Sequence, residues 1–132
     1  MNLLKSITAA LLFLTCGLYT HLAMADGHGV YEIRTYVTNE GKLDALHTRF
    51  SEHTMRLFEK HGMRNVAYWT PIDSTDTLIY ILEHDSAESA KASWDAFIND
   101  PEWQAVYAAS IADGRLVKTI DNHFMTKTPY SP

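Results

Sequence analysis

The segment Thr77–His84 reads TLIYILEH, and its central residues Leu78–Leu82 are apolar at every position. Successive side chains of a strand point to opposite faces of a sheet, so a strand with one face in water shows polar residues at alternate positions. Leu78–Leu82 lacks that alternation, which predicts a strand buried on both faces. The rest of the chain must therefore supply a cover for each side of the sheet.

Three further strands and a long helix are predicted from periodicity and turn residues. Val30–Thr38 and Arg64–Ile72 are rich in β-branched and aromatic residues, and residues 118–126 form a last strand. Lys42–His61 has helical spacing and ends before Gly62, which suits the left-handed position after a helix.

A second helical region follows the third strand. Asp85 can cap its first turn with Glu88 reaching back, and the expected buried side is Ala90, Trp94, Phe97 and Ile98. The sequence Asn99-Asp100-Pro101 then breaks and restarts the helix, with Asp100 as the new cap, and an apolar stripe continues to Gly114.

The element order is strand, helix, strand, strand, helix, strand, which predicts an α+β fold with a ferredoxin-like βαββαβ protomer. In that arrangement an antiparallel sheet carries both helical regions on one face, so the second face of Leu78–Leu82 stays uncovered. A second copy related by a two-fold axis is the economical cover. We therefore expect a homodimer that pairs through the sheet face.

Residues 1–25 have the pattern of a secretory signal peptide: Lys5, the apolar run Ala9–Leu14, and Ala23-Met24-Ala25 as a cleavage site. Cleavage after Ala25 would leave a domain of residues 26–132, exported to the periplasm or secreted. An uncleaved anchor is disfavoured because polar residues interrupt the apolar run before the roughly 20 residues that a membrane span needs. A lipoprotein at Cys16 is disfavoured by the residues preceding it.

Charge and cysteine content limit the partners. The chain has 16 acidic and 11 basic residues, and cleavage would remove one of the basic ones, Lys5. This acidic balance argues against nucleic acid and against stable membrane association after signal cleavage. Cleavage would also remove Cys16, the single cysteine, which leaves neither disulfides nor thiol chemistry.

One histidine interrupts the apolar stripe of the first helix. Large apolar residues recur with helical spacing at Leu43, Leu46, Phe50 and Leu57. The position between Phe50 and Leu57 that continues this spacing is occupied by His53. A histidine on the sheet-facing side could act as a general base or orient a substrate oxygen. The alternative is a partly buried histidine that is hydrogen-bonded within the core.

The first strand carries a second candidate group. Tyr31, Ile33, Thr35 and Val37 share one face, the expected packing face, and Glu32, Arg34 and Tyr36 share the other. Glu32 and Arg34 are either an ion pair that locks the dimer or a charged wall of a ligand cavity. Arg34 could hold a carboxylate or phenolate in a bidentate manner.

Aromatic residues could line the ligand pocket between the first helix and the sheet, or simply fill the core. The candidates for ligand binding are Tyr36, Trp69, Tyr80 and Trp94. No metal site is expected, because the histidines do not show i, i+4 spacing on a helix or an H-E-x-x-H motif. Haem needs only one well-placed histidine and stays an alternative, with His53, His84 and His123 as candidates.

Several longer segments resemble one family over most of the expected mature chain. VYEIRTY from Val30, F-x-x-H-T-x-R-L-F-E-K-H-G-M from Phe50, AYWTP from Ala67, AKASWDAFINDPEW from Ala90 and the closing TPYSP are similar to the NIPSNAP family of the dimeric α+β barrel superfamily. The resemblance implies a ferredoxin-like protomer that pairs its sheet with a partner's. It implies little about activity, because relatives include cofactor-free monooxygenases, haem-dependent enzymes and eukaryotic adaptors.

Three functions remain open from the sequence. The first is binding of a small hydrophobic or aromatic molecule with cofactor-free monooxygenase-type chemistry, in which His53 and Arg34 supply the polar groups. The second is binding of a hydrophobic or haem-like ligand without a reaction. The third is a dimeric, stress-related interaction module without catalytic activity.

Overall fold

The computed structural model describes residues 29–132. The predicted signal peptide, residues 1–25, lies outside the described residues. The elements follow in the order β1 (Val30–Thr38), α1 (Leu43–Arg49), η1 (Phe50–Thr54), α2 (Met55–Lys60), β2 (Arg64–Trp69), β3 (Thr77–His84), α3 (Ala87–Ile98), α4 (Pro101–Ser110) and β4 (Val117–Thr126).

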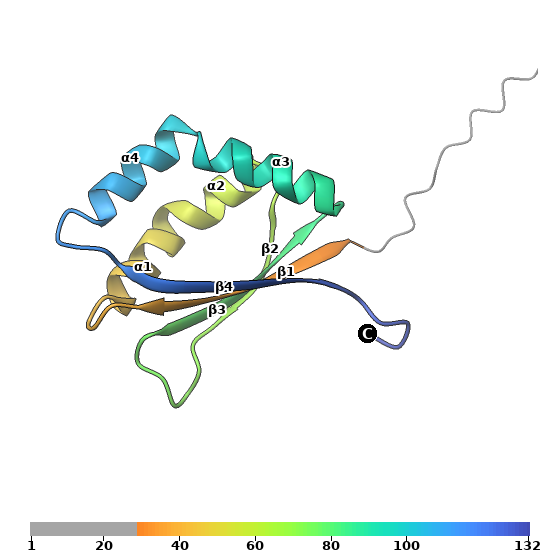
Figure 1. Cartoon of the computed structure of the whole chain (residues 1–132), viewed down its shortest axis with the longest axis horizontal. Helices are drawn as coiled ribbons and strands as arrows, with labels where there is room; N and C mark the ends of the chain where they lie inside the picture. Colours follow the sequence, from red (N-terminus) through yellow and green to blue (C-terminus); the bar gives the residue numbers. More distant parts are fainter. Residues whose placement is uncertain (1–28) are drawn as a thin grey trace, which may run out of the picture.

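The four strands form one antiparallel sheet in the order β2-β3-β1-β4. Figure 1 shows the helices together on one side of this sheet, with β4 along one edge. The small α+β fold with a ferredoxin-like sheet is confirmed. Among the described residues, no helix is long and apolar enough to span a membrane.

The helix boundaries follow the predicted signals at two points and differ at a third. Gly62 has a φ of 78° directly after the first helical region, and Asp100 accepts a hydrogen bond from Glu102 N at 2.8 Å at the start of α4. The cap of α3 is Ser86, not Asp85, because the Ser86 and Ser89 hydroxyls each accept from the other residue's backbone N–H.

The first helical region contains a π-helical turn, η1, between α1 and α2. The Thr54 hydroxyl donates to the Arg49 carbonyl, five residues earlier, at 3.1 Å. This wider turn changes the register, so Thr54 is the buried residue after Phe50 and His53 is only partly buried. The prediction that His53 faces the sheet is therefore wrong.

The core lies between the helices and the inner face of the sheet. Side chains at alternate β3 positions, including Leu78, Tyr80 and Leu82, are buried there. They pack with a cluster that also contains Leu46, Phe50, Leu57, Phe58, Met63, Phe97 and Leu116. Burial of these side chains is the main source of stability, at roughly 25 cal/mol per Å² of apolar surface removed from water.

The two faces of β1 are reversed with respect to the sequence prediction. Glu32 and Tyr36 are buried and lie on the helix side, while Ile33 and Thr35 lie on the other face. The buried charge of Glu32 is tolerated because several donors converge on its carboxylate. The Glu32–Arg34 pair therefore lies on the inner face of the sheet and not on the outer face through which we expect the dimer to pair.

Within residues 29–132, no helix covers the outer face of the sheet (Figure 1). The centre of this face is apolar. Ile33 lies opposite Ile81 on the neighbouring strand, and Ile79 lies opposite Trp69. Ile33, Ile79 and Ile81 are only partly buried in the protomer, and half of the Trp69 surface is exposed. The absence of alternation in Leu78–Leu82 thus corresponds to one covered face and one uncovered apolar face.

Candidate functional site

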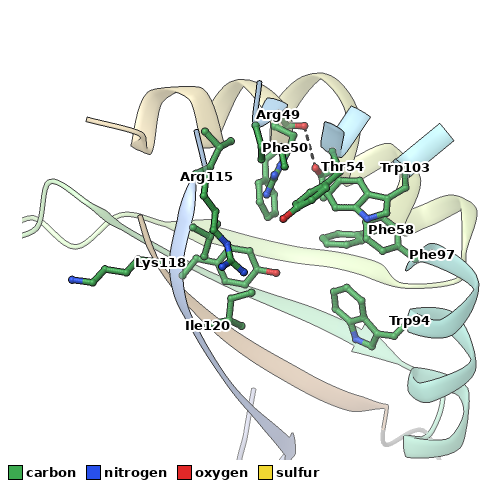
Figure 2. Close-up of a pocket in the computed structure, with 15 residues that line it drawn as sticks. Arg49, Phe50, Thr54, Phe58, Trp94, Phe97, Trp103, Arg115, Lys118 and Ile120 are labelled. Atoms are coloured by element: carbon green, nitrogen blue, oxygen red, sulfur yellow. Dashed lines mark hydrogen bonds between the residues drawn. The ribbon is translucent and has the colours of Figure 1, made fainter. Parts of the chain in front are cut away.

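A cavity of about 270 Å³ lies between the helices and the β1–β4 side of the sheet. Figure 2 shows rings from the helices on one side of it, with Arg115 and Ile120 on another. We call it the aromatic cavity, and its lining is Tyr36, Arg49, Phe50, Thr54, Phe58, Trp94, Phe97, Trp103, Tyr107, Ile111, Arg115, Leu116, Val117, Lys118 and Ile120.

The aromatic walls are fixed by contacts between rings from different helices. Phe97 of α3 and Trp103 of α4 have ring centroids 4.4 Å apart, and Trp103 lies 5.7 Å from Tyr107. Phe58 lies 5.4 Å from Trp94 in an edge-to-face arrangement. Because the rings support one another, the walls of the cavity are preorganised.

Arg49 places a buried guanidinium in this wall. Its residue is 5% exposed, and Nη1 donates to Ser110 Oγ at 3.1 Å. The guanidinium carbon lies 5.3 Å from the Trp103 ring centroid and 5.5 Å from that of Tyr107. Burial lowers the pKa of Arg49, although the neighbouring tyrosines oppose the shift. An arginine stays charged at neutral pH even so.

A second polar group, the Glu32 cluster, adjoins the cavity through Trp94. Glu32 accepts from Trp94 Nε1 at 2.7 Å, Arg34 Nη1 at 2.5 Å and His84 Nε2 at 3.0 Å. Asn122 adds a longer bond of 3.3 Å from β4. The guanidinium of Arg34 also lies 4.3 Å from the Trp94 ring centroid, so this cluster holds the indole in place.

The charges of the cluster are balanced internally. Burial by itself raises the pKa of Glu32, but hydrogen bonds from His84 and Trp94 and the charge of Arg34 outweigh it and leave that pKa lowered. Burial acts to lower the pKa of Arg34, whereas the nearby tyrosines and Glu32 raise it overall. Glu32 and Arg34 are therefore held as an ion pair.

The predicted site residues are divided among different parts of the molecule. Tyr36 and Trp94 line the aromatic cavity, and Arg34 contacts both rings without lining it. Tyr80 has no exposed surface and is stacked in the core on Tyr68, 5.3 Å between centroids. Trp69 lines a different, more open cavity beside η1.

His53 lies on the outside of the helical layer. It lines an open groove between η1 and α4, and 44% of its side chain is exposed. Its Nε2 is 3.8 Å from a carboxylate oxygen of Glu52. A general base at this position would not reach a molecule in the aromatic cavity.

The histidines considered for haem do not fit an axial ligand in the aromatic cavity. His84 is fully buried in the Glu32 cluster, and His123 lies exposed on β4 beside Asp121. Neither they nor His53 line that cavity. Among residues 29–132, no group of three or more histidine, cysteine, aspartate or glutamate side chains is arranged to hold a metal ion.

Sequence reasoning missed Arg49 and the cavity-lining role of Trp103 and Tyr107. Arg49 comes three residues after the fully buried Leu46, so helical spacing alone places it near the inner face. Trp103 and Tyr107 are four residues apart on α4 and share one of its faces. These two helical spacings are the sequence signals that could have identified the three residues.

Solved structures of proteins from Agrobacterium tumefaciens and Burkholderia xenovorans show the same fold. A NIPSNAP family protein of unknown function from Agrobacterium tumefaciens is 24% identical, with a TM-score of 0.69 over 80% of this chain and 93% of the other. An uncharacterised NIPSNAP domain protein from Burkholderia xenovorans is 18% identical, with a TM-score of 0.67 over 78% of this chain and 98% of its own.

A more distant likeness is to a putative antibiotic biosynthesis monooxygenase from Nitrosomonas europaea. That protein is 10% identical, with a TM-score of 0.59 over 80% of this chain and 96% of its own. This similarity concerns the fold alone. The comparison with functionally curated proteins gave no match.

The family model for NIPSNAP matches residues 31–132, which include every helix and nearly every strand residue that the structure describes. The match extends over β1, the helices that build the aromatic cavity, and β4. The chain therefore belongs to the NIPSNAP family.

Proposed function

We propose that this NIPSNAP-family chain binds a small, planar, mainly apolar molecule in the aromatic cavity. The observation that carries the proposal is a space of about 270 Å³ walled by rings from β1, η1, α2, α3 and α4. An apolar cavity of about 150 Å³ is large enough for benzene. A molecule of one or two fused rings therefore matches the available space.

Binding is favoured over a purely structural role because the surrounding core is closely packed. Phe58, Tyr80 and Leu57 have almost no exposed surface, whereas the cavity beside them stays open. Protein interiors are packed at crystal-like density, so a space of this size costs stability unless something occupies it. A protein that serves only as an interaction module would not need this cavity.

Monooxygenase-type chemistry is a second candidate, supported at the level of the fold by the Nitrosomonas europaea protein. Cofactor-free oxidation of a phenol needs a base that removes a proton. Among the described residues that line the cavity, none is a histidine or a carboxylate. Binding without turnover is therefore the preferred form of the proposal.

The same proposal includes a homodimer formed through the outer face of the sheet and export after cleavage at Ala25. The dimer is supported by the uncovered Ile33, Ile79 and Ile81, which a partner sheet would remove from water.

Export is supported by the sequence pattern of residues 1–25. Mass spectrometry of the protein from a periplasmic fraction should give a chain that starts at Asp26, and a chain that retains residues 1–25 would contradict export by cleavage.

Isothermal titration with 2-naphthol, a neutral two-ring probe, tests the binding function. The wild-type protein should bind it, and Ile111→Trp should weaken binding about tenfold or more, because the larger ring occupies the cavity. The matched control is Val106→Trp, which places the same indole in the groove between η1 and α4. Absence of binding, or equal weakening by both variants, would contradict the proposal.

A further inference from the structure

The buried arginine of the aromatic cavity has an unfilled hydrogen-bonding capacity. A guanidinium carries five N–H donors. Within residues 29–132, Arg49 donates to one side-chain acceptor, Ser110 Oγ, and its buried Nε has no partner. An unpaired buried donor costs free energy, and a buried charge costs more unless it meets an opposite charge.

Arg34 shows how this fold balances the charge of another largely buried arginine. Arg34 is paired with the Glu32 carboxylate at 2.5 Å on the inner face of β1. Arg49 is more buried than exposed surface arginines such as Arg56, yet no described carboxylate lies within ion-pair distance of it. Arg49 lines both the aromatic cavity and the groove between η1 and α4, and its guanidinium lies over the rings of Trp103 and Tyr107, which line the aromatic cavity.

The other charged residues that line the aromatic cavity are also positive. Arg115 and Lys118 also line the cavity, and none of the described lining residues is acidic. Figure 2 shows Arg115 reaching inward beside Ile120, while the Lys118 ammonium points away. Because the whole chain carries a net charge of −5, this positive site contrasts with the overall charge and would attract anions locally.

We propose that the ligand of the aromatic cavity is an anion, a one- or two-ring aromatic carboxylate whose oxygens are held by Arg49. This inference rests on the proposed binding function and names its ligand class. The planar guanidinium fits a carboxylate with two parallel hydrogen bonds. The ring system would pack against Trp103, Phe97 and Phe58, and Arg115 would add a second positive charge.

The test compares two probes of the same shape by isothermal titration, 2-naphthoate and its neutral isostere 2-naphthamide. The wild-type protein should bind the anion about tenfold or more tightly than the amide, as expected for a hydrogen-bonded charge pair in a partly buried site. Equal affinities would overturn the anion inference and leave the binding function standing. If neither naphthoate, naphthamide nor 2-naphthol binds, the binding function itself fails.

Substitutions of Arg49 test whether this residue causes the preference for naphthoate over naphthamide. Arg49→Met keeps an unbranched apolar side chain and removes the guanidinium with its charge. The ratio of naphthoate affinity to naphthamide affinity should therefore fall to about one, while the amide still binds. Arg49→Lys should retain part of the preference. The control is Arg56→Met, an exposed arginine paired with Glu102. A preference that survives Arg49→Met would overturn the assignment, and if that variant does not fold, the wild-type comparison and Arg49→Lys decide.

Discussion

The indole Nε1 of Trp94 donates a hydrogen bond of 2.7 Å to Oε2 of Glu32, which joins α3 to β1 at the edge of the aromatic cavity. The same carboxylate accepts from Arg34 and His84. A wall residue of the cavity is thus positioned by a buried acid. The polar residue Glu32 on the inner face of β1 therefore serves to hold Trp94 in position.

We expect Glu32→Gln to destabilise the protein by about 3 kcal/mol, because the buried guanidinium of Arg34 would lose its counter-charge. Urea unfolding followed by circular dichroism measures the change. Glu40→Gln, at an exposed turn, is the control and should change the free energy of unfolding by less than about 0.5 kcal/mol. Equal stability of wild type and Glu32→Gln would show that the cluster contributes nothing.

The start of α4 should make stability depend on acid pH. Hydrogen bonds from Lys60 and His61 and from the Glu102 backbone lower the pKa of Asp100 well below its ordinary value of 3.8. A carboxyl group with a lowered folded-state pKa stabilises the fold above its unfolded pKa, and this contribution is lost as the pH falls below about 4.

Asp100→Asn keeps a capping side chain and removes the charge. The difference in unfolding free energy between wild type and this variant should be constant at pH 5 to 7 and should shrink towards pH 3. Chemical denaturation at each pH measures it, with Asp73→Asn at an exposed turn as the control. A difference that does not change with pH would mean that the Asp100 charge is not linked to folding.

The outer face of the sheet should hold a second copy of the chain. Ile81→Lys places a charge at the centre of this face, opposite Ile33, and should convert a dimer into a folded monomer. Analytical ultracentrifugation at micromolar concentration gives the mass. Ile98→Lys, on the exposed side of α3, is the matched control and should remain a dimer. A wild-type protein that sediments as a protomer would contradict the proposed assembly.

His53→Leu should leave the affinity for 2-naphthol unchanged, because the imidazole lines the outer groove and not the aromatic cavity. Its half-exposed side chain also predicts a change in stability within about 0.5 kcal/mol. Titration and urea unfolding of the same preparation check both statements. A loss of affinity without loss of structure would restore His53 as a ligand-contacting residue.

Local signals predicted the element order well. Gly62 and the Asp100-Pro101 pair each mark a helix boundary through backbone conformation or capping, which depends on a few adjacent residues. The register of the first helical region could not be predicted in this way. The π-helical turn at Phe50–Thr54 has no sequence signature of its own, and it moves His53 away from the face that ideal helical spacing assigns to it.

The candidate site was harder to predict because its contacts are distant in sequence. The face that Glu32 occupies depends on His84 and Trp94, 52 and 62 residues further along the chain. Periodicity favours the more apolar side of β1 as the buried one, and no local rule reveals a set of distant donors. Helical spacing after Leu46 places Arg49 near the inner face, but no local rule reveals that Trp103 and Tyr107 of α4 pack over its guanidinium.

The most direct test of ligand binding in the aromatic cavity is to follow the three tryptophan indole N–H signals by ¹H–¹⁵N NMR during titration with 2-naphthoate. Trp94 and Trp103 line this cavity, whereas Trp69 lines a separate one. We predict saturable shifts of the Trp94 and Trp103 signals with Trp69 unchanged. Shifts confined to Trp69, or no shift at any of the three, would contradict the account.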